Sequence, residues 1–247
     1  MKIQLLIIAF QLFLNAQLWC QTAENKIDTQ GMKQGYWQKK EADGSLRYEG
    51  KFVNDQPEGI FKHYYPTGKI KSVSYYSNKG KNIRSKNFDE AGWIMAVGNY
   101  IDKKKDSVWT YFDEKGKILT KESFKNGTPN GDWFIYYDSL KVSEKVSYIK
   151  GLKQGSWVQF FDNGNKKVTA FYVNDKLDGK YTAYFPDGKS RAIGYYKDDV
   201  KNGQWIFYKN DGNIEETELF KDGVSNKEYK IPEEPDSIKV LPPLPEK

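Results

Sequence analysis

Residues 131–148 read GDWFIYYDSLKVSEKVSY, residues 155–172 read GSWVQFFDNGNKKVTAFY, and residues 203–220 read GQWIFYKNDGNIEETELF. Each stretch opens on Gly-x-Trp and closes on an aromatic residue. Gly131 and Gly155 are 24 residues apart, and Gly203 follows after two further steps of 24. Self-similarity at a fixed period indicates a repeat architecture, in which one short structural unit is stacked many times.

The same register continues through most of the chain. Further openings are Gly35-Tyr36-Trp37, Gly59-Ile60-Phe61, Ser107-Val108-Trp109 and Gly179-Lys180-Tyr181. A closing aromatic stands at Phe52, Tyr76, Tyr100, Phe124, Tyr148, Tyr172, Tyr196 and Phe220. A turn glycine stands at Gly44, Gly68, Gly92, Gly116, Gly164, Gly188 and Gly212, and Leu140 replaces it once. The copy that begins at Ile83 has lost the opening motif and carries Ser85 at the aromatic position, so we expect this third copy to be the weak point.

Within one copy, two short aromatic or β-branched runs alternate with turn signals. Trp133 to Tyr137 is one such run, and Pro186-Asp187-Gly188 and Lys125-Asn126-Gly127 are typical hairpin turns. Turns about a dozen residues apart leave no room for long helices. The sequence therefore predicts an all-β fold: an elongated antiparallel meander of tandem 24-residue β-hairpin repeats in a single extended sheet, to which each copy adds two strands.

The ends of the chain have a different composition. Residues 1–20 have a basic start, an apolar run and a polar exit, which predicts a signal peptide cleaved after Ala16 or Cys20. The bulky Trp19 before Cys20 argues against a lipoprotein. We expect a short linker at 21–30, eight or more repeats over 31–229, and an extended proline-rich tail at 230–247. The leader predicts an exported protein of the periplasm, the outer-membrane surface or the extracellular medium.

The pattern Gly-x-Trp-x-x-(Tyr/Phe)-(Tyr/Phe)-x-x-Gly-x-(Ile/Val), followed by Tyr and then Asn-Gly, resembles the MORN-repeat superfamily. It is most similar to the variant repeat of the bacterial YwqK-type antitoxin family, from Gly31 to about Tyr229. The resemblance implies a sheet of hairpins without catalysis by the repeats, and a role in scaffolding or membrane association. The antitoxin family implies a toxin as the protein partner, whereas the export signal departs from an antitoxin that acts inside the cell.

Composition argues against several classes of site. One cysteine, Cys20, and one histidine, His63, supply neither a disulfide nor the four ligands of a structural zinc site. We expect no catalytic residues, no cofactor and no metal. Aspartates near the turn glycines predict turns, in which Asp bonds its own backbone, in preference to calcium sites: Asp43, Asp113, Asp162, Asp187 and Asp211. The net charge of +6 comes from finely mixed charges, which argues against nucleic acid as a partner.

Two sets of residues are candidates for binding. The aromatic column could bind a ligand such as glycan rings, although packing of the sheet is the preferred interpretation: Trp109, Trp133, Trp157, Tyr181 and Trp205. Lysines near the inter-unit turns could form an edge row facing a glycan or anionic membrane: Lys153, Lys176, Lys201 and Lys221. The first hypothesis is a protein-interaction or scaffolding module of the bacterial envelope. The alternatives are a module that binds glycan, cell wall or membrane, and an antitoxin-like partner of a toxin.

Overall fold

The structure is a computed structural model, and it describes residues 25–137 and 140–226. All regular elements in this part are β-strands, and they form one antiparallel sheet of twenty strands. The predicted all-β fold of tandem hairpins is thereby confirmed. The predicted signal peptide, the start of the linker and the proline-rich tail lie outside the described residues.

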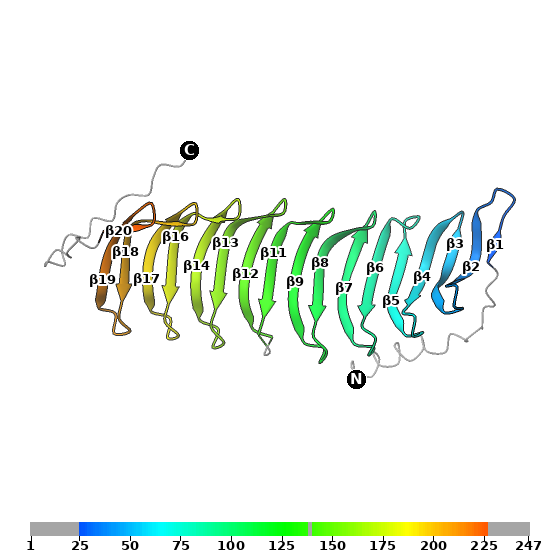
Figure 1. Cartoon of the computed structure of the whole chain (residues 1–247), viewed down its shortest axis with the longest axis horizontal. Coiled ribbons are helices and arrows are strands. Elements are labelled where there is room, and N and C mark those ends of the chain that lie inside the picture. Colours follow the sequence, from blue (N-terminus) through cyan, green and yellow to red (C-terminus); the bar gives the residue numbers. More distant parts are fainter. Residues whose placement is uncertain (1–24, 138–139, 227–247) are drawn as a thin grey trace, which may run out of the picture. The chain divides into compact units, whose positions relative to one another are not determined.

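The chain divides into two compact units (Figure 1). The described part of the first unit comprises residues 25–85 and 90–92, and the second unit comprises 86–89 and the residues from Trp93 onward. The boundary at Ser85 falls inside the degenerate third copy, in strand β6 (Asn82–Phe88). The strands of the first unit are β1 (Lys26–Ile27), β2 (Lys33–Lys40), β3 (Leu46–Val53), β4 (Gln56–Tyr64) and β5 (Ile70–Ser77).

The second unit holds the remaining strands. They are β7 (Ile94–Ile101), β8 (Lys104–Phe112), β9 (Ile118–Lys125), β10 (Thr128–Pro129), β11 (Gly131–Tyr136), β12 (Val142–Ile149), β13 (Leu152–Phe160), β14 (Lys166–Val173), β15 (Lys176–Leu177), β16 (Gly179–Tyr184), β17 (Ser190–Lys197), β18 (Val200–Tyr208), β19 (Ile214–Lys221) and β20 (Val224–Asn226).

Within each unit the strands pair in chain order. In the first unit β1 to β5 form a meander. In the second unit β10 and β11 together occupy the place of one long strand beside β9, and β15 and β16 do the same beside β14. Each complete copy of the repeat thus adds one strand that carries the Gly-x-Trp motif and one that carries the closing aromatic.

Two kinds of turn alternate along the chain. After the closing aromatic, two consecutive residues adopt left-handed backbone angles, as at Asn174 (φ 49°) and Asp175 (φ 69°). This is the geometry of a two-residue type I′ turn, whose twist matches that of the strands it joins. At the other end of the hairpin, a three-residue loop closes with Gly164 (φ 88°), whose N–H donates to the carbonyl of Phe161 at 2.9 Å. Leu140 takes this position with φ 62°, as the sequence predicts from its place in the glycine column.

The opening glycine of each copy lies at a β-bulge. Between β12 and β13, Val146 pairs with Trp157 but Tyr148 pairs with Lys153, so β13 has extra residues at Gly155 (φ 93°). Such a bulge needs a left-handed residue, which glycine adopts without steric cost. Ser107 adopts the same angle (φ 60°) where serine replaces glycine. The glycine column therefore has a backbone explanation that is independent of any phosphate or ligand.

The hydrophobic core is a single layer of side chains on one face of each unit. Alternate residues of a strand point to opposite faces, so the Gly-x-Trp aromatic and the closing aromatic share one face, here called the ring face. Most of the buried apolar residues lie on it, among them Phe52, Phe61, Trp109, Trp205 and Phe220. The other face, here called the opposite face, carries the alternating positions of the same strands.

Candidate functional site

The predicted aromatic column lies on the ring face, and its members differ in accessibility. Trp109 and Trp205 are almost fully buried, with 1% and 2% of their surface exposed. Trp133, Trp157 and Tyr181 are half-buried. Each ring packs against the closing aromatic of its own copy or the preceding one, as Trp205 does against Tyr196 at 5.2 Å and Phe220 at 6.1 Å between centroids. The structure thus places Trp109 and Trp205 in the core, where a ligand cannot stack on them.

A second column, which the sequence analysis did not identify, decides how deeply each ring is buried. Gly98 and Gly194 lie on the strand before Trp109 and Trp205, and a β-carbon added to either glycine would lie 2.2 Å from the tryptophan ring. The rings therefore rest directly on glycine backbone. In the half-buried cases the same column holds a side chain: Glu122 before Trp133, Val146 before Trp157 and Ala170 before Tyr181.

Polar contacts fix the buried rings in place. The indole N–H of Trp109 donates to the carbonyl of Asn99 at 3.0 Å, and that of Trp205 donates to the carbonyl of Tyr195 at 3.1 Å. The Lys201 ammonium lies 4.3 Å from the Trp205 ring centroid and 4.7 Å from that of Phe220. Buried indole groups usually find such a partner, and cation–π contacts add stabilisation. These contacts mark the tryptophans as structural elements of the sheet.

The predicted lysine edge row is dispersed among separate contacts. Lys153 covers the Tyr172 ring at 4.9 Å, and Lys201 covers the Trp205 ring. Lys176 pairs with Asp198 at 3.4 Å in an exposed ion pair. Three of the four lysines in the row are thus engaged within the protein, and Lys221 is exposed.

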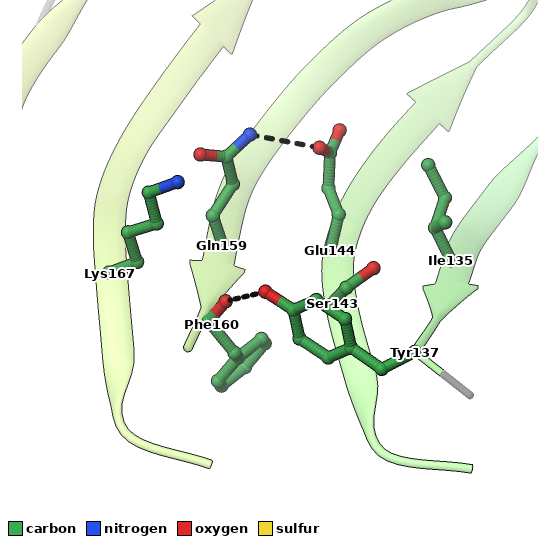
Figure 2. Close-up of a pocket in the computed structure, with 7 residues that line it drawn as sticks. All are labelled: Ile135, Tyr137, Ser143, Glu144, Gln159, Phe160 and Lys167. Atoms are coloured by element: carbon green, nitrogen blue, oxygen red, sulfur yellow. Dashed lines mark hydrogen bonds between the residues drawn. The ribbon is translucent and has the colours of Figure 1, made fainter. Parts of the chain in front are cut away.

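A shallow depression of about 180 Å³ lies on the ring face of the second unit. Figure 2 shows its lining residues on neighbouring strands, where the Gln159 amide donates to Glu144 at 3.0 Å and the Tyr137 hydroxyl donates to the carbonyl of Phe160 at 2.7 Å. Ile135 and Lys167 complete its rim. Its polar groups bond one another, so the depression continues the cross-strand packing of the sheet.

The opposite face of the second unit carries a line of exposed apolar side chains. Phe171, Tyr195 and Leu219 occupy the same position in three successive copies and are 51%, 47% and 37% exposed. We call these three residues the apolar row. In the earlier copies of the second unit, polar residues occupy the equivalent position: Asn99, Ser123 and Ser147. The sequence analysis did not identify this row, because its residues sit beside the more regular closing aromatics.

The comparison with protein families bears directly on this repeated geometry. Five segments of the chain match the MORN repeat variant. They are residues 57–78, 105–126, 153–174, 177–198 and 201–222. Repeats of this kind often mediate protein or membrane interactions, so the chain contains a repeat module suited to binding or scaffolding. No match was found among curated proteins.

Solved structures share stretches of similar fold with the MORN-type repeats. The chain is similar to part of the GtfA/B complex, at 15% identity and a TM-score of 0.27, over 51% of this chain and 21% of that one. It is also similar to parts of TcdB2-TccC3-Cdc42 and of the Photorhabdus luminescens Tc holotoxin pore, each at 10% identity and a TM-score of 0.19. These matches cover 78% and 76% of this chain but only 15% and 13% of the others. The chain thus spans about a fifth or less of the length of these proteins.

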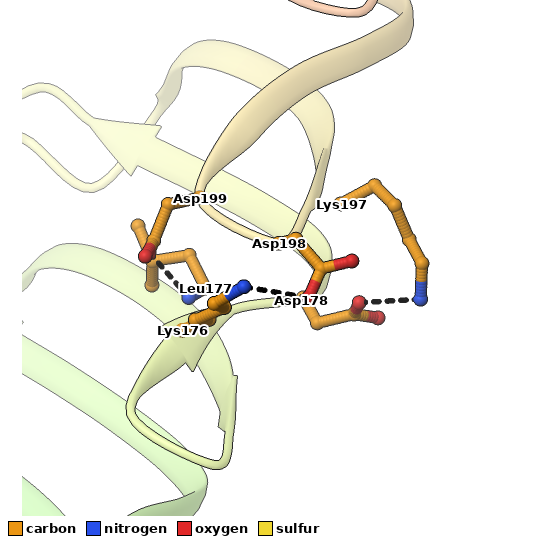
Figure 3. A network of polar contacts seen from close by, with 6 residues as sticks. All are labelled: Lys176, Leu177, Asp178, Lys197, Asp198 and Asp199. Carbon is orange, nitrogen blue, oxygen red and sulfur yellow. Dashed lines mark hydrogen bonds and ion pairs between the residues drawn. The ribbon is translucent and has the colours of Figure 1, made fainter.

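Successive MORN-type repeats are joined at their type I′ turns. The backbone N–H of Asp199 donates to the carbonyl of Leu177 at 2.9 Å, and the N–H of Leu177 donates to Asp199 Oδ1 at 2.6 Å. Asp175 and Lys153 repeat this reciprocal pair one copy earlier. Figure 3 shows the pair beside the contacts of Lys176 with Asp198 and Lys197 with Asp178. The aspartates of these turns therefore bond backbone groups.

The aspartates at the three-residue loops likewise bond the backbone, as predicted. Asp43, Asp113, Asp187 and Asp211 each accept a hydrogen bond from the N–H two residues later. The hydrogen bonds of Asp211 with Asn213 lower the pKa of its carboxyl group. In the described part of the chain, no group of three or more His, Cys, Asp or Glu side chains could hold a metal ion.

A polar cluster in the first unit surrounds Glu49 on the opposite face. The Tyr64 hydroxyl donates to Glu49 Oε1 at 2.6 Å, and Lys62 lies 3.3 Å from the same oxygen. Burial alone would raise the pKa of Glu49, but hydrogen bonds from Tyr64, Tyr36, Gln38 and Lys62 outweigh it and lower the pKa to about 2. Glu49 is thus a buried anion that ties three strands together.

His63 lies on the ring face beside Tyr48 and Ser72. Burial lowers its pKa, and the positive charges of Arg47 and Lys71 lower it further. The Ser72 hydroxyl lies 3.4 Å from Nδ1. No carboxylate hydrogen-bonds this imidazole within the described residues, so the hydroxyl and the ring form a pair without the acid that orients the histidine of a catalytic triad. Along the described ranges there is also no helix long and apolar enough to cross a membrane.

Proposed function

We propose that this chain is an exported protein of the bacterial envelope whose repeats bind a partner protein and act as a scaffold for it. The repeats have no catalytic role in this proposal. The leader in residues 1–20 supports export, and the match to MORN-type repeats supports a binding or scaffolding role.

The observation that carries the proposal is the single-layer sheet. Domains usually bury a sheet against a second layer, whereas every regular element of the described chain belongs to the sheet itself. Large apolar side chains are consequently exposed, among them Ile60 (61%) and Tyr75 (55%) in the first unit. Exposed apolar groups on a broad rigid surface are characteristic of contact sites for other proteins.

A glycan- or membrane-binding role receives less support from the site. The expected stacking platform requires accessible tryptophans, and Trp109 and Trp205 are buried. The expected lysine row is largely occupied by ring and ion-pair contacts. A toxin, as the antitoxin resemblance implies, is one class of protein partner that fits the same proposal.

Site-specific photo-cross-linking in the bacterial host tests the proposal. The full chain carries a photoreactive residue at Phe171 or at Tyr75, both of which are exposed, or at the buried Trp109 as the negative control. We expect an envelope protein to be captured from at least one exposed position and none from position 109. A chain that stays in the cytoplasm with its leader intact, or that captures no protein from either exposed position, contradicts the proposal.

A further inference from the structure

The apolar row is not required by the fold, because the chain itself contains the polar alternative. At the same position in earlier copies, Ser123 and Ser147 are folded into the sheet, and their hydroxyls donate to the Asp132 carbonyl and to Asp132 Oδ1. Phe171, Tyr195 and Leu219 instead extend into solvent. An exposed position that accepts serine in two copies and a large apolar residue in three successive copies indicates a surface with a task beyond folding.

The spacing of the row follows from strand pairing. Phe171 lies on β14, Tyr195 on β17 and Leu219 on β19, with β16 between the first two and β18 between the last two. Strands in a sheet are about 4.8 Å apart, so successive members of the row lie about 9.6 Å apart. The residues directly opposite them on the paired strands are Ser156, Lys180 and Gln204, which leave lower ground between the apolar side chains.

This spacing matches one repeat of an α-helix that lies across the strands. A helix rises about 1.5 Å per residue, so seven residues span about 10.5 Å. Apolar residues repeated every seven positions would therefore meet the three members of the row with a drift of about 1 Å per step. Amphipathic helices dock on apolar surfaces through such periodic anchors.

The charges around the row define the flanks of that helix. Lys180 pairs across the sheet with Tyr195, and Lys197 and Lys221 follow Tyr195 and Leu219 by two residues on the same strands and hence on the same face. Asp178 is the acidic neighbour, and it bonds Lys197 at 2.7 Å. The surface beside the row is thus mainly basic and favours an acidic partner.

Resting on the proposed function, we propose that the apolar row is the docking site for an amphipathic helix of a partner protein, with apolar residues at heptad spacing and acidic residues at their flanks. The helix lies across β14 to β19 on the opposite face, and its apolar residues pack between Phe171, Tyr195 and Leu219. Lys180 and Lys221 attract its acidic flanks.

Synthetic peptides of three heptads test this assignment against the chain that begins at residue 21. The first peptide has Leu at two positions of every heptad and Glu at the flanks. The second has the same composition with the Leu residues at alternate positions, and the third has Lys in place of Glu. We expect binding and induced helical circular dichroism with the first peptide, at least tenfold weaker binding with the second, and weaker binding with the third that varies oppositely with salt.

The double variant Phe171→Ser/Tyr195→Ser should weaken binding of the first peptide at least tenfold. Its serines copy those that Ser123 and Ser147 place at the same position, so its thermal unfolding should remain cooperative. Tyr75→Ser, at the same position in the first unit, is the matched control and should leave binding unchanged. A variant that still binds the first peptide overturns the proposal, as does equal binding of the first two peptides.

The other occupants give distinct results. If the first peptide does not bind and the row cross-links a second copy of this chain, or binds only vesicles or polysaccharide, the helix proposal is wrong. If position 171 captures an envelope protein in the host while no helical peptide binds, the helix proposal fails but the proposed function stands. Failure of both experiments removes both proposals.

Discussion

At the scale of single residues, the sheet depends on pairs of large and small side chains from successive strands. Gly194 and Trp205 form one pair, and Ala170 and Tyr181 occupy the same two positions one copy earlier. A smaller ring accompanies the larger backbone residue. Because cores are close-packed, neither member of a pair can change freely without the other.

Gly194→Ala should therefore destabilise the protein by about 1–3 kcal/mol, since overpacking forces the Trp205 ring out of place. Urea unfolding measures the loss, and a red shift of the tryptophan emission reports the exposed ring. Adding Trp205→Tyr should recover part of the stability, because the double variant reproduces the native Ala170–Tyr181 pair. Additive losses in the double variant would show that the two residues are not coupled.

Glu49 supplies the second residue-scale prediction, which concerns acid stability. Its pKa is lowered to about 2 in the folded protein, so its contribution is fully present above the ordinary value of 4.5 and is lost as the pH falls from there toward 2. Glu49→Gln should flatten the pH dependence of the unfolding free energy in this window. Unfolding of both proteins at pH 6 and pH 3 measures the difference. Identical slopes would mean that the cluster does not hold the anion.

At the scale of one strand, the bulge at the start of each copy fixes where the aromatic residue points. Gly35, Gly59, Gly155 and Gly203 adopt left-handed angles there, and Ser107 does so with a side chain. A left-handed angle costs an L-residue about 1–2 kcal/mol relative to glycine, part of which the greater chain entropy of glycine offsets.

Ser107→Gly should accordingly stabilise the protein by about 0.5–1 kcal/mol. Thermal or urea unfolding measures the gain. Ser156→Gly is the matched control, because Ser156 lies in an ordinary strand position of β13 and its replacement should destabilise by about 0.5–1 kcal/mol. The same sign of change in both variants would contradict the assigned bulge.

The sequence is sufficient for the period, the strand pairs and the turn chemistry, because these depend on residues close together in the chain. The loop at Gly164 and the aspartate turn at Asp187 illustrate this. The exposure of each ring was not predictable in the same way. It depends on Gly98 or Glu122 on the preceding strand, and that contact is known only once the register across the bulge is known.

The apolar row escaped sequence analysis for a related reason. Phe171 and Tyr195 directly precede the closing aromatics Tyr172 and Tyr196, and adjacent aromatics read as one apolar run. Strand alternation sends the two members of each pair to opposite faces. Only the assignment of a core to the ring face shows that the first member is exposed.

At the scale of the whole molecule, the central claim is that 24 residues form one structural unit, which adds two strands and returns the chain to the same register. Each copy contacts mainly its neighbours, through strand pairing and the turn contacts of Asp175 and Asp199. Stability in such proteins is approximately a sum of neighbour terms. Removal of one whole copy should therefore preserve the fold, whereas removal of nearly one copy should not.

Excision of residues 153–176, compared with excision of residues 153–175, tests this claim most directly. The first deletion joins Leu152 to Leu177 in register, and we predict an unchanged β-type circular dichroism spectrum, cooperative urea unfolding and a buried Trp205. The second shifts the register by one residue and turns the following side chains to the wrong face, so cooperative unfolding should be lost. Equal behaviour of the two deletions, or collapse of the 24-residue one, would contradict the account.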